Sequence, residues 1–246
     1  MEMHAFSNFG ETLALITAIV WSISVILFKK SGETVRPLGL NLFKNTLTLL
    51  LMPPTMLALG ESIFAPAPSS DYVLLLLSGV LGIGIADTLF FWSLNLLGAA
   101  RSAIVDCLYS PVIILLSIFW LGERLTNAQA VGALIIISAV FTIGKEKGLV
   151  QITRRQLMTG ILLGVLSMLA MGIGIVMIKP ILERSPVLWA IEVRLIGAAA
   201  ALFIILGFCR KRKEVVRSIM ELRGWKYMIP GSFLGLFQYQ DLLVQS

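Results

Sequence analysis

The feature that most constrains this chain is the uncharged apolar run PVIILLSIFWL at residues 111–121, inside the longer stretch 100–126. A helix made from this run has no charge on any face, so it suits lipid better than water. Asp106 and Tyr109 nevertheless place polar groups beside the run, and polar groups in hydrocarbon usually face a cavity or a partner helix. The stretch therefore predicts a membrane helix that presents part of its surface to other helices.

Similar apolar runs recur along the whole chain, which excludes a soluble body with one membrane anchor. The 246 residues are 57% hydrophobic and 14% charged, against roughly 45–50% apolar and 25% charged residues in soluble domains. We expect an all-α polytopic membrane protein, with seven spans, a possible partial eighth, and a basic loop over residues 209–226. The predicted spans are residues 12–28, 38–59, 72–97, 99–121, 128–144, 157–178, 187–208 and, as the eighth candidate, 228–244.

The net charge of +6 comes mainly from basic residues between the apolar runs. That placement favours positive loops flanking membrane spans over a nucleic-acid-binding surface. Residues 1–10 contain no Lys or Arg, so we expect a first transmembrane helix rather than a cleaved signal peptide. With this span count, the positive-inside rule places Lys29, Lys30 and the basic segment 209–226 in the cytoplasm and the N-terminus outside.

An internal repeat is visible when the chain is compared with itself. A shift of 150 residues superimposes Lys29 on Lys179, Glu33 on Glu183, Leu38 on Leu188, and Lys44 on Arg194. A shift of 153 residues superimposes SGVLG (78–82) on GSFLG (231–235). These matches predict a duplicated unit of five helices, and an odd number of helices inverts the second copy, as in many transporters.

The two predicted copies differ in completeness. We expect a first repeat over residues 11–144, a polar linker over 145–156, and an incomplete second repeat over 157–246, with helices six, seven and part of eight. About seven or eight helices of an expected ten are then present. A truncation, a frameshifted reading and a short natural variant are all compatible with the polar end FQYQDLLVQS (237–246).

Polar side chains recur at helical spacing inside two predicted spans. In the second span Asn41, Lys44 and Asn45 share one face. Besides a functional site, a network that joins two helices or a lysine reaching to the membrane surface would explain them. In the third span Asp87 and Asn95 form a similar stripe, and Asp87 needs a partner because it lies far from both ends.

Charge pairing narrows the roles of these groups. Lys44 or Arg101 is the natural partner of Asp87. Burial favours the protonated carboxyl, so we expect Asp87 or Asp106 to carry a coupling proton if transport is proton-linked. Arg194 takes the place of Lys44 in the second copy and is the better cavity candidate, because Glu192 lies about 200° away around the same helix.

The tryptophan, cysteine, histidine and glycine residues say less about function. Trp21 in the middle of the first span predicts a pocket wall or plain helix packing. Cys107 and Cys209 have no partner motif, and the single histidine, His4, is in the N-terminal tail, so we expect neither a metal site nor a catalytic triad. The glycines of GVLGIG (79–84) and of the sixth span (164–174) fit close helix packing rather than a dinucleotide-binding loop.

Three segments together resemble EamA-type transporters of the drug/metabolite transporter (DMT) superfamily. They are WSISVILFKKSGE (21–33), ADTLFFWSLNLLGAARSAIV (86–105) and LYSPVIILLSIFWLGERLTNAQAVGALIIISAVF (108–141). The last has a proline in the fourth helix, L-G-E-x-L-T at its end with Glu123, and a Gln followed by G-x-x-x-I in the fifth. The resemblance covers one complete repeat and the first half of a second.

The resemblance implies ten helices in two inverted repeats, a central cavity, alternating access, and both termini in the cytoplasm. Such transporters move amino acids, drugs, sugars, nucleotide-related compounds and other metabolites. This chain departs from the pattern by ending about two helices early and by its charge distribution, which favours an external N-terminus. The orientation therefore stays open between the two arguments.

We expect a multi-pass carrier of the cytoplasmic (inner) membrane that moves a small metabolite or drug-like compound, driven by a gradient or by exchange. Its partners would be the lipid bilayer, the substrate and protons, with no cofactor, no metal and no nucleic acid; the oligomeric state is left open. An integral membrane enzyme and a non-functional fragment are the alternatives, although no pair of nucleophile and base is visible. The cavity-lining candidates are Trp21, Asn41, Lys44, Asn45, Asp87, Asn95, Asp106, Tyr109 and Arg194.

Overall fold

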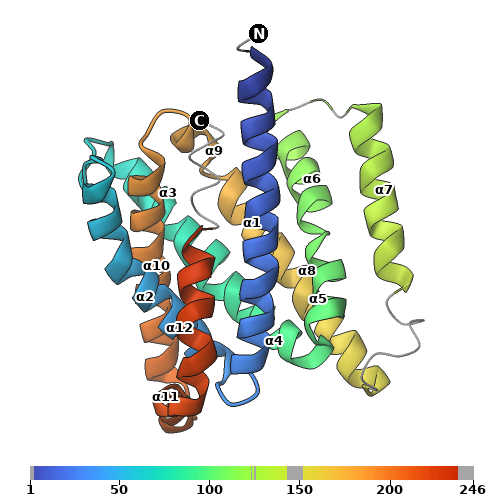
Figure 1. The fold of residues 1–246 in the computed structure, drawn as a ribbon, viewed down its shortest axis with the longest axis vertical. Coiled ribbons are helices and arrows are strands. Elements are labelled where there is room, and N and C mark those ends of the chain that lie inside the picture. Colours follow the sequence, from blue (N-terminus) through green and yellow to red (C-terminus); the bar gives the residue numbers. More distant parts are fainter. Residues whose placement is uncertain (1–2, 123, 125, 143–151, 238–246) are drawn as a thin grey trace.

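The computed structural model describes residues 3–122, 124, 126–142 and 152–237, and this part of the chain is helical with no strands. Long helices stand roughly side by side, with α6 and α7 at one edge of the group (Figure 1). The helices are α1 (Met3–Ser31), α2 (Pro37–Ala58), α3 (Ser69–Gly79), η1 (Val80–Ile85), α4 (Ala86–Leu97), α5 (Ala99–Asp106), α6 (Tyr109–Leu121), α7 (Asn127–Thr142), α8 (Arg154–Val176), α9 (Lys179–Leu182), α10 (Val187–Phe208), α11 (Arg212–Met220) and α12 (Leu222–Phe237).

The predicted fold class, an all-α polytopic membrane protein, is confirmed. Within the described residues, four helical stretches are long and apolar enough to cross a membrane: Ser69–Leu97, Ala99–Trp120, Arg154–Val176 and Val187–Phe208. The shorter apolar helix Asn127–Val140 adds to them. Large apolar side chains also point outward, as expected of a lipid-facing surface; Phe119 is 85% exposed and Phe208 88% exposed.

Two predicted spans are interrupted. The third runs as α3, then the π-helical turn η1, then α4. The fourth changes from α5 to α6 through a turn at Cys107 and Leu108. A π-helical turn leaves main-chain carbonyls differently placed from those of an α-helix, and such turns are frequent at functional sites.

The predicted loop over residues 209–226 is wrong. This segment contains the helix α11 and the beginning of α12. Val215 is 3% exposed and packs, with Ile219, around Gly39 at the start of α2. Apolar residues at helical spacing therefore fold this basic segment into an amphipathic helix. The predicted eighth span, residues 228–244, falls partly on the helix α12, which begins at Leu222; residues 238–244 lie outside the described residues.

The helix α2 continues to Ala58 with Pro53 and Pro54 inside it. The helix α8 begins at Arg154 because Thr153 and Gln156 form a reciprocal capping box. Most of the predicted linker 145–156, including Lys145 and Lys147, lies outside the described residues, as do Glu123 and residues 238–246.

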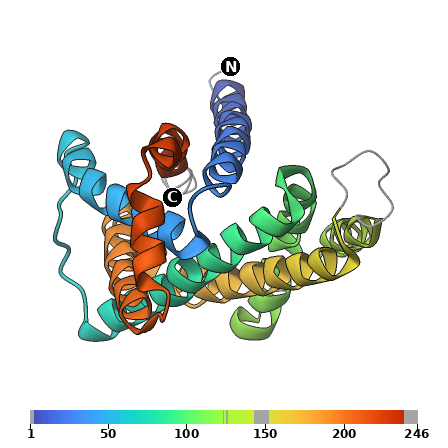
Figure 2. The same cartoon turned by 90° about the horizontal axis from the view of Figure 1, so that it is seen from below.

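Two helix pairs hold the molecule together. The helix α8 packs along η1 and α4, and α1 packs along α12. Between these pairs, α10 contacts α2, α3 and η1. The view from below shows α7 at the periphery, away from α10 and α12 (Figure 2). The buried apolar residues form one cluster around Trp189 and Ile191 of α10 and a second around Phe28, Phe90 and Phe91.

Small residues bring α8 close to η1 and α4, which confirms the prediction of glycine-mediated packing. A Cβ atom on Gly174 would lie 2.9 Å from Gly82 Cα, and one on Gly164 would lie 3.0 Å from Ser93 Oγ. Serine hydroxyls join the same helices by donating to main-chain carbonyls: Ser78 to Gly174 at 2.6 Å, Ser93 to Gly160 at 2.7 Å, and Ser167 to Ala86 at 2.7 Å.

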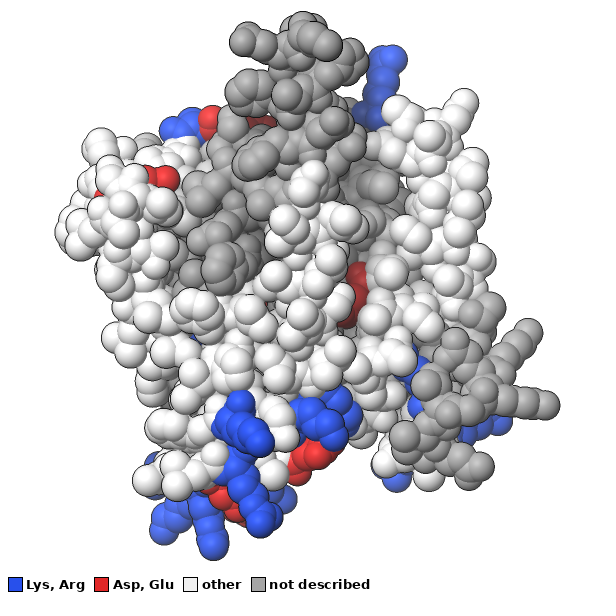
Figure 3. All heavy atoms as spheres, in the orientation of Figure 1, with Lys and Arg blue, Asp and Glu red and all other residues white. Residues whose placement is uncertain are grey.

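Basic side chains gather at one end of the molecule, opposite the end from which α1 begins (Figure 3). On the face shown, the described atoms of the middle zone carry few charges. An uncharged belt between charged ends matches the hydrocarbon layer of a bilayer.

Candidate polar site inside the helix bundle

Lys44 of α2 and Asp87 of α4 form a buried ion pair, as expected for the third-span carboxylate. The ammonium donates to Asp87 Oδ2, and each side chain is only 10% exposed. The alternative in which Lys44 reaches to the membrane surface is therefore wrong. A charge inside a membrane bundle requires such a partner, because neither group can be solvated by lipid.

Asn41, one turn earlier on α2, binds the π-helical turn. Its Nδ2 donates to the carbonyls of Ile83 and Gly84, at 3.1 and 2.9 Å, and to Thr88 Oγ1 at 2.9 Å. The side chain is fully buried. Main-chain carbonyls left exposed by a π-helical turn need donors in a dry interior, and Asn41 supplies them.

Asn45 and Thr48 complete the polar face but bond within α2. Asn45 Nδ2 donates to the Asn41 carbonyl at 3.0 Å and to Asn41 Oδ1 at 2.5 Å. Thr48 Oγ1 donates to the Lys44 carbonyl at 2.9 Å. Asn45 Oδ1 is buried without a hydrogen-bond partner among the described residues. Asn45 thus orients Asn41 and retains an acceptor for another donor.

Aromatic side chains enclose the ion pair on one side. The Lys44 ammonium lies 5.9 Å from the centre of the Phe91 ring, within the range of a cation–π interaction. Phe91 contacts Phe90, and Phe90 stacks on Trp21 with ring centres 6.1 Å apart. Tyr109 packs against the same cluster. The structure thus brings Trp21, Tyr109 and Lys44 to one aromatic wall.

Arg194 of α10 lies against the π-helical turn. It is 5% exposed, and a Cβ atom on Gly82 would lie 3.3 Å from its terminal nitrogen. Glu192, two residues earlier on the same helix, is 8% exposed, and its Oε2 has no hydrogen-bond partner among the described residues. Asn41 and Arg194 therefore both approach η1, each from a different helix.

Asn95 does not join this group, because it lies two turns farther along α4. Its carbonyl accepts a hydrogen bond of 3.1 Å from Lys29 Nζ. Asn95, Lys29 and Arg101 line a cavity of about 330 Å³ together with Gly98 and Ile152. Arg101 is 7% exposed. Asp87 therefore pairs with Lys44, and Arg101 lies in a separate cationic pocket.

Asp106 is the last residue of α5, immediately before the break in the fourth span. Its side chain is half-buried. Asp106 therefore lies at the break in the fourth span, whereas Asp87 lies near the start of α4.

The π-helical turn and its contact with Asn41 are the features that sequence reasoning missed. The glycines of GVLGIG indicated close packing, but no sequence pattern predicts that i→i+5 hydrogen bonds form there. The pocket lined by Lys29 was also missed, because Lys29 follows the apolar run directly and resembles an ordinary flanking charge.

This arrangement combines charged, amide and aromatic groups of the kinds that recognise a polar solute. The described residues contain no group of three or more His, Cys, Asp or Glu side chains that could hold a metal ion. They do provide fixed positive and negative groups, amide groups and aromatic faces in a dry interior. Sites for small molecules combine apolar walls with a few such polar groups.

Comparison with known proteins agrees with this picture. Residues 8–145 match the EamA-like transporter family. "Uncharacterized transporter YoaV" of Bacillus subtilis (strain 168) is 28% identical over 140 residues, which are 54% of this chain and 46% of that protein. The chain therefore matches about half the length of this relative.

A solved crystal structure, described only as "Crystal structure of protein", shares the fold. It aligns with a TM-score of 0.59 and 20% identity over 96% of this chain and 84% of that chain. The family match covers more than half of the sequence and includes α1 to α7, the helices that supply the ion pair and the aromatic wall. The chain belongs to the EamA-like transporter family.

Proposed function

We propose that this protein is a secondary transporter that moves a small polar metabolite or a drug-like compound through the membrane by alternating access. The observation that carries the proposal is the buried Lys44–Asp87 ion pair between α2 and α4. Ionised groups inside a membrane bundle are costly and usually mark the path of a substrate or an ion. Family membership supports transport rather than catalysis.

Helix packing supports a duplicated and inverted unit. The helices α2 and α10 have 22 residues each and begin at Pro37 and Val187, which is the shift of 150 residues expected from the sequence. In the duplicated unit, α1 would correspond to α8, and the α3–η1–α4 span would correspond to α12. The contact of α8 with α4 is then the counterpart of the contact of α1 with α12, and both contacts are present. Such reciprocity is expected when two copies face each other across a pseudo-two-fold axis.

We assign the first unit to residues 11–144, a linker to 145–156 and the second unit to 157–246. The substrate site would lie where the two units meet. Lys44, Asp87 and Arg194 would supply the charges, Asn41 and Asn45 the amide contacts, and Trp21 and Tyr109 the aromatic walls. Asn95 would contact the substrate at the cationic pocket with Lys29 and Arg101, as it enters or leaves the central substrate site. Asp106, at the break between α5 and α6, would serve as a second carboxylate.

Energy would come from a gradient or from exchange. A carboxylate that is protonated on one side of the membrane and released on the other couples transport to protons, and Asp87 and Asp106 are the two candidates. The ends of α1, α8 and α11 that carry Lys30, Arg154 and Arg212 lie at one end of the molecule (Figures 1 and 3). The positive-inside rule favours that end as the cytoplasmic one, in a cytoplasmic (inner) membrane.

Transport into vesicles tests the function. The full chain is reconstituted into liposomes, and uptake of a panel of labelled amino acids, sugars, nucleosides and amphiphilic drugs is measured with and without a pH gradient. We expect saturable uptake of at least one class, and its loss in Lys44→Met. The matched control is Lys226→Met, because Lys226 is an exposed lysine away from the ion pair. Equal uptake by protein-containing and empty vesicles across the panel would contradict the proposal.

A further inference from the structure

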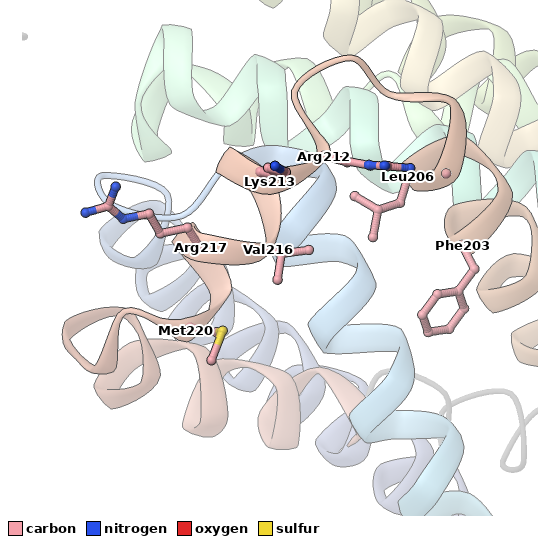
Figure 4. A pocket seen from close by; sticks show the side chains of 8 residues that line it. Phe203, Leu206, Arg212, Lys213, Val216, Arg217 and Met220 are labelled. Atoms are coloured by element: carbon pink, nitrogen blue, oxygen red, sulfur yellow. The ribbon is translucent and has the colours of Figure 1, made fainter.

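An apolar groove with a basic end lies between α10 and α11, outside the polar site. It has a volume of about 570 Å³, within the range of ligand-binding pockets. Figure 4 shows Phe203 and Leu206 of α10 on one side and Val216 and Met220 of α11 on the other. Phe203 is 55% exposed, and Met220 is 71% exposed. The walls of the groove are thus apolar side chains that the rest of the described chain leaves uncovered.

Three cations border this apolar groove. Arg212, Lys213 and Arg217 line it, and the first two lie near the turn from α10 into α11 (Figure 4). In the described part of the chain, Glu214 of the same helix forms its ion pair with Arg36 and not with these cations. The groove therefore combines an apolar length with a concentrated positive charge at one end.

Packing against α2 fixes the rotation of α11 about its own axis. Val215 and Ile219 lie against Gly39 of α2, and Ser218 Oγ accepts a hydrogen bond of 3.3 Å from the main-chain nitrogen of Arg36. With this face anchored, Val216 and Met220 must point the other way, toward α10. The groove is thus formed by a fixed helix and not by a free basic segment.

The groove also lies where the polar and apolar layers of a membrane meet. The apolar span Val187–Phe208 ends directly before α11. Phe203 is part of this apolar span, and Arg212 follows its end. An anionic lipid has this order of groups, since its phosphate lies at the interface and its acyl chains lie in the hydrocarbon.

We propose that the groove between α10 and α11 binds an anionic phospholipid. The phosphate contacts Arg212 and Lys213, Arg217 adds long-range attraction from the rim, and an acyl chain lies along Phe203, Val216 and Met220. Charge complementarity favours this occupant over a zwitterionic lipid. The apolar walls favour it over a soluble phosphate, which would leave them bare.

Lipid binding by the purified full chain tests the proposal. The protein is prepared in detergent, and retention of phosphatidylglycerol is compared with that of phosphatidylcholine of the same chain length by native mass spectrometry and by a labelled-lipid titration. The test variant replaces Arg212, Lys213 and Arg217 by Gln. The control variant replaces Arg154, Arg155 and Arg223 by Gln, which removes the same charge from exposed sites outside the groove.

We expect the test variant to lose about tenfold or more in affinity for phosphatidylglycerol, because each basic group near the surface attracts anionic lipid. The control variant should change by about twofold or less. An equal loss in both variants would overturn the proposal, because it would mean diffuse attraction without a site. Equal retention of the two lipids by the unmodified protein would overturn it as well.

Two further measurements separate the occupants. Met220→Gln leaves the charges intact and makes one wall of the groove polar. It should therefore weaken the binding of phosphatidylglycerol but not the binding of inorganic phosphate. Competition by inorganic phosphate or by glycerophosphoglycerol, which has no acyl chains, as strong as that of the intact lipid would show a soluble-phosphate site and contradict the proposal. The oligomeric state of both proteins is measured as well. If the unmodified protein is a dimer, Met220→Gln is a monomer and lipid retention is unchanged, a second copy covers the groove and the proposal is wrong.

Discussion

Lys44 and Asp87 are 43 residues apart in the chain, yet they form an ion pair in which each side chain is 10% exposed. Asn41 of α2 also donates to Thr88 of α4 and to the carbonyls of the π-helical turn that precedes α4. A dry interior makes each charge depend on the other. Removing one partner of such a pair costs about 3–5 kcal/mol, whereas replacing both by apolar residues is often neutral.

The first prediction concerns this pair. Lys44→Met and Asp87→Leu should each destabilise the protein by about 3–5 kcal/mol, and the double variant should recover most of that loss. Thermal unfolding in detergent measures the three stabilities, and vesicle uptake measures function. The double variant should recover its stability, but it should not transport the substrate. A double variant that transports like the unmodified protein would show that the pair is only structural.

The second prediction concerns Asn41. Asn41→Asp keeps the size of the side chain but replaces the donor by a carboxylate facing the carbonyls of Ile83 and Gly84. An unsatisfied buried polar group costs about 1–3 kcal/mol, and more when it is charged. We expect a lower unfolding temperature and faster hydrogen exchange at residues 80–88. Asn127→Asp is the control, since Asn127 is exposed at the start of α7; an equal loss there would contradict the role of Asn41.

The third prediction concerns close helix packing. A Cβ atom on Gly174 would lie 2.9 Å from Gly82 Cα and 3.2 Å from the carbonyl oxygen of Ser78, and these main-chain atoms cannot move aside without shifting a helix. Gly174→Ala should therefore destabilise the protein by about 1–3 kcal/mol. Gly132→Ala in α7 has open space around the new methyl group, so its stability should stay unchanged or rise. Unfolding temperatures in one detergent compare the two.

The fourth prediction concerns proton coupling. If Asp106 carries the coupling proton, Asp106→Asn should make uptake independent of the imposed pH gradient while exchange of substrate continues. Asp87→Asn distinguishes the two carboxylates, because it also breaks the pair with Lys44 and should reduce exchange as well. Uptake is measured at several external pH values. A gradient dependence that persists unchanged in both variants would rule out both groups.

Much of the architecture follows from the sequence because membrane spans are local features. A run such as Val187–Phe208 must form a helix in lipid, since only a helix satisfies its own main-chain hydrogen bonds there. The predicted span 187–208 and the helix α10 coincide. The polar faces with Asn41, Lys44 and Asp87 could also be recognised locally, because a side chain of this kind in an apolar run stands out.

Segments whose structure depends on neighbours were harder to predict. The basic segment 209–226 suggested a loop, because its charges outnumber its apolar residues, and only packing of Val215 and Ile219 against Gly39 makes α11 a fixed helix. The break of the fourth span after Asp106 and the π-helical turn at Val80–Ile85 likewise depend on how helices meet.

The sequence by itself determined that this is a helical membrane protein of the EamA-like type, where most of its spans lie, and that buried charges need partners. Tertiary structure decided which partners they have: Lys44 for Asp87, and a separate pocket with Lys29 and Asn95 for Arg101. The physical reason is that hydrophobicity and helical periodicity act over neighbouring residues, whereas the choice between two cations depends on which helices pack together and how each is rotated.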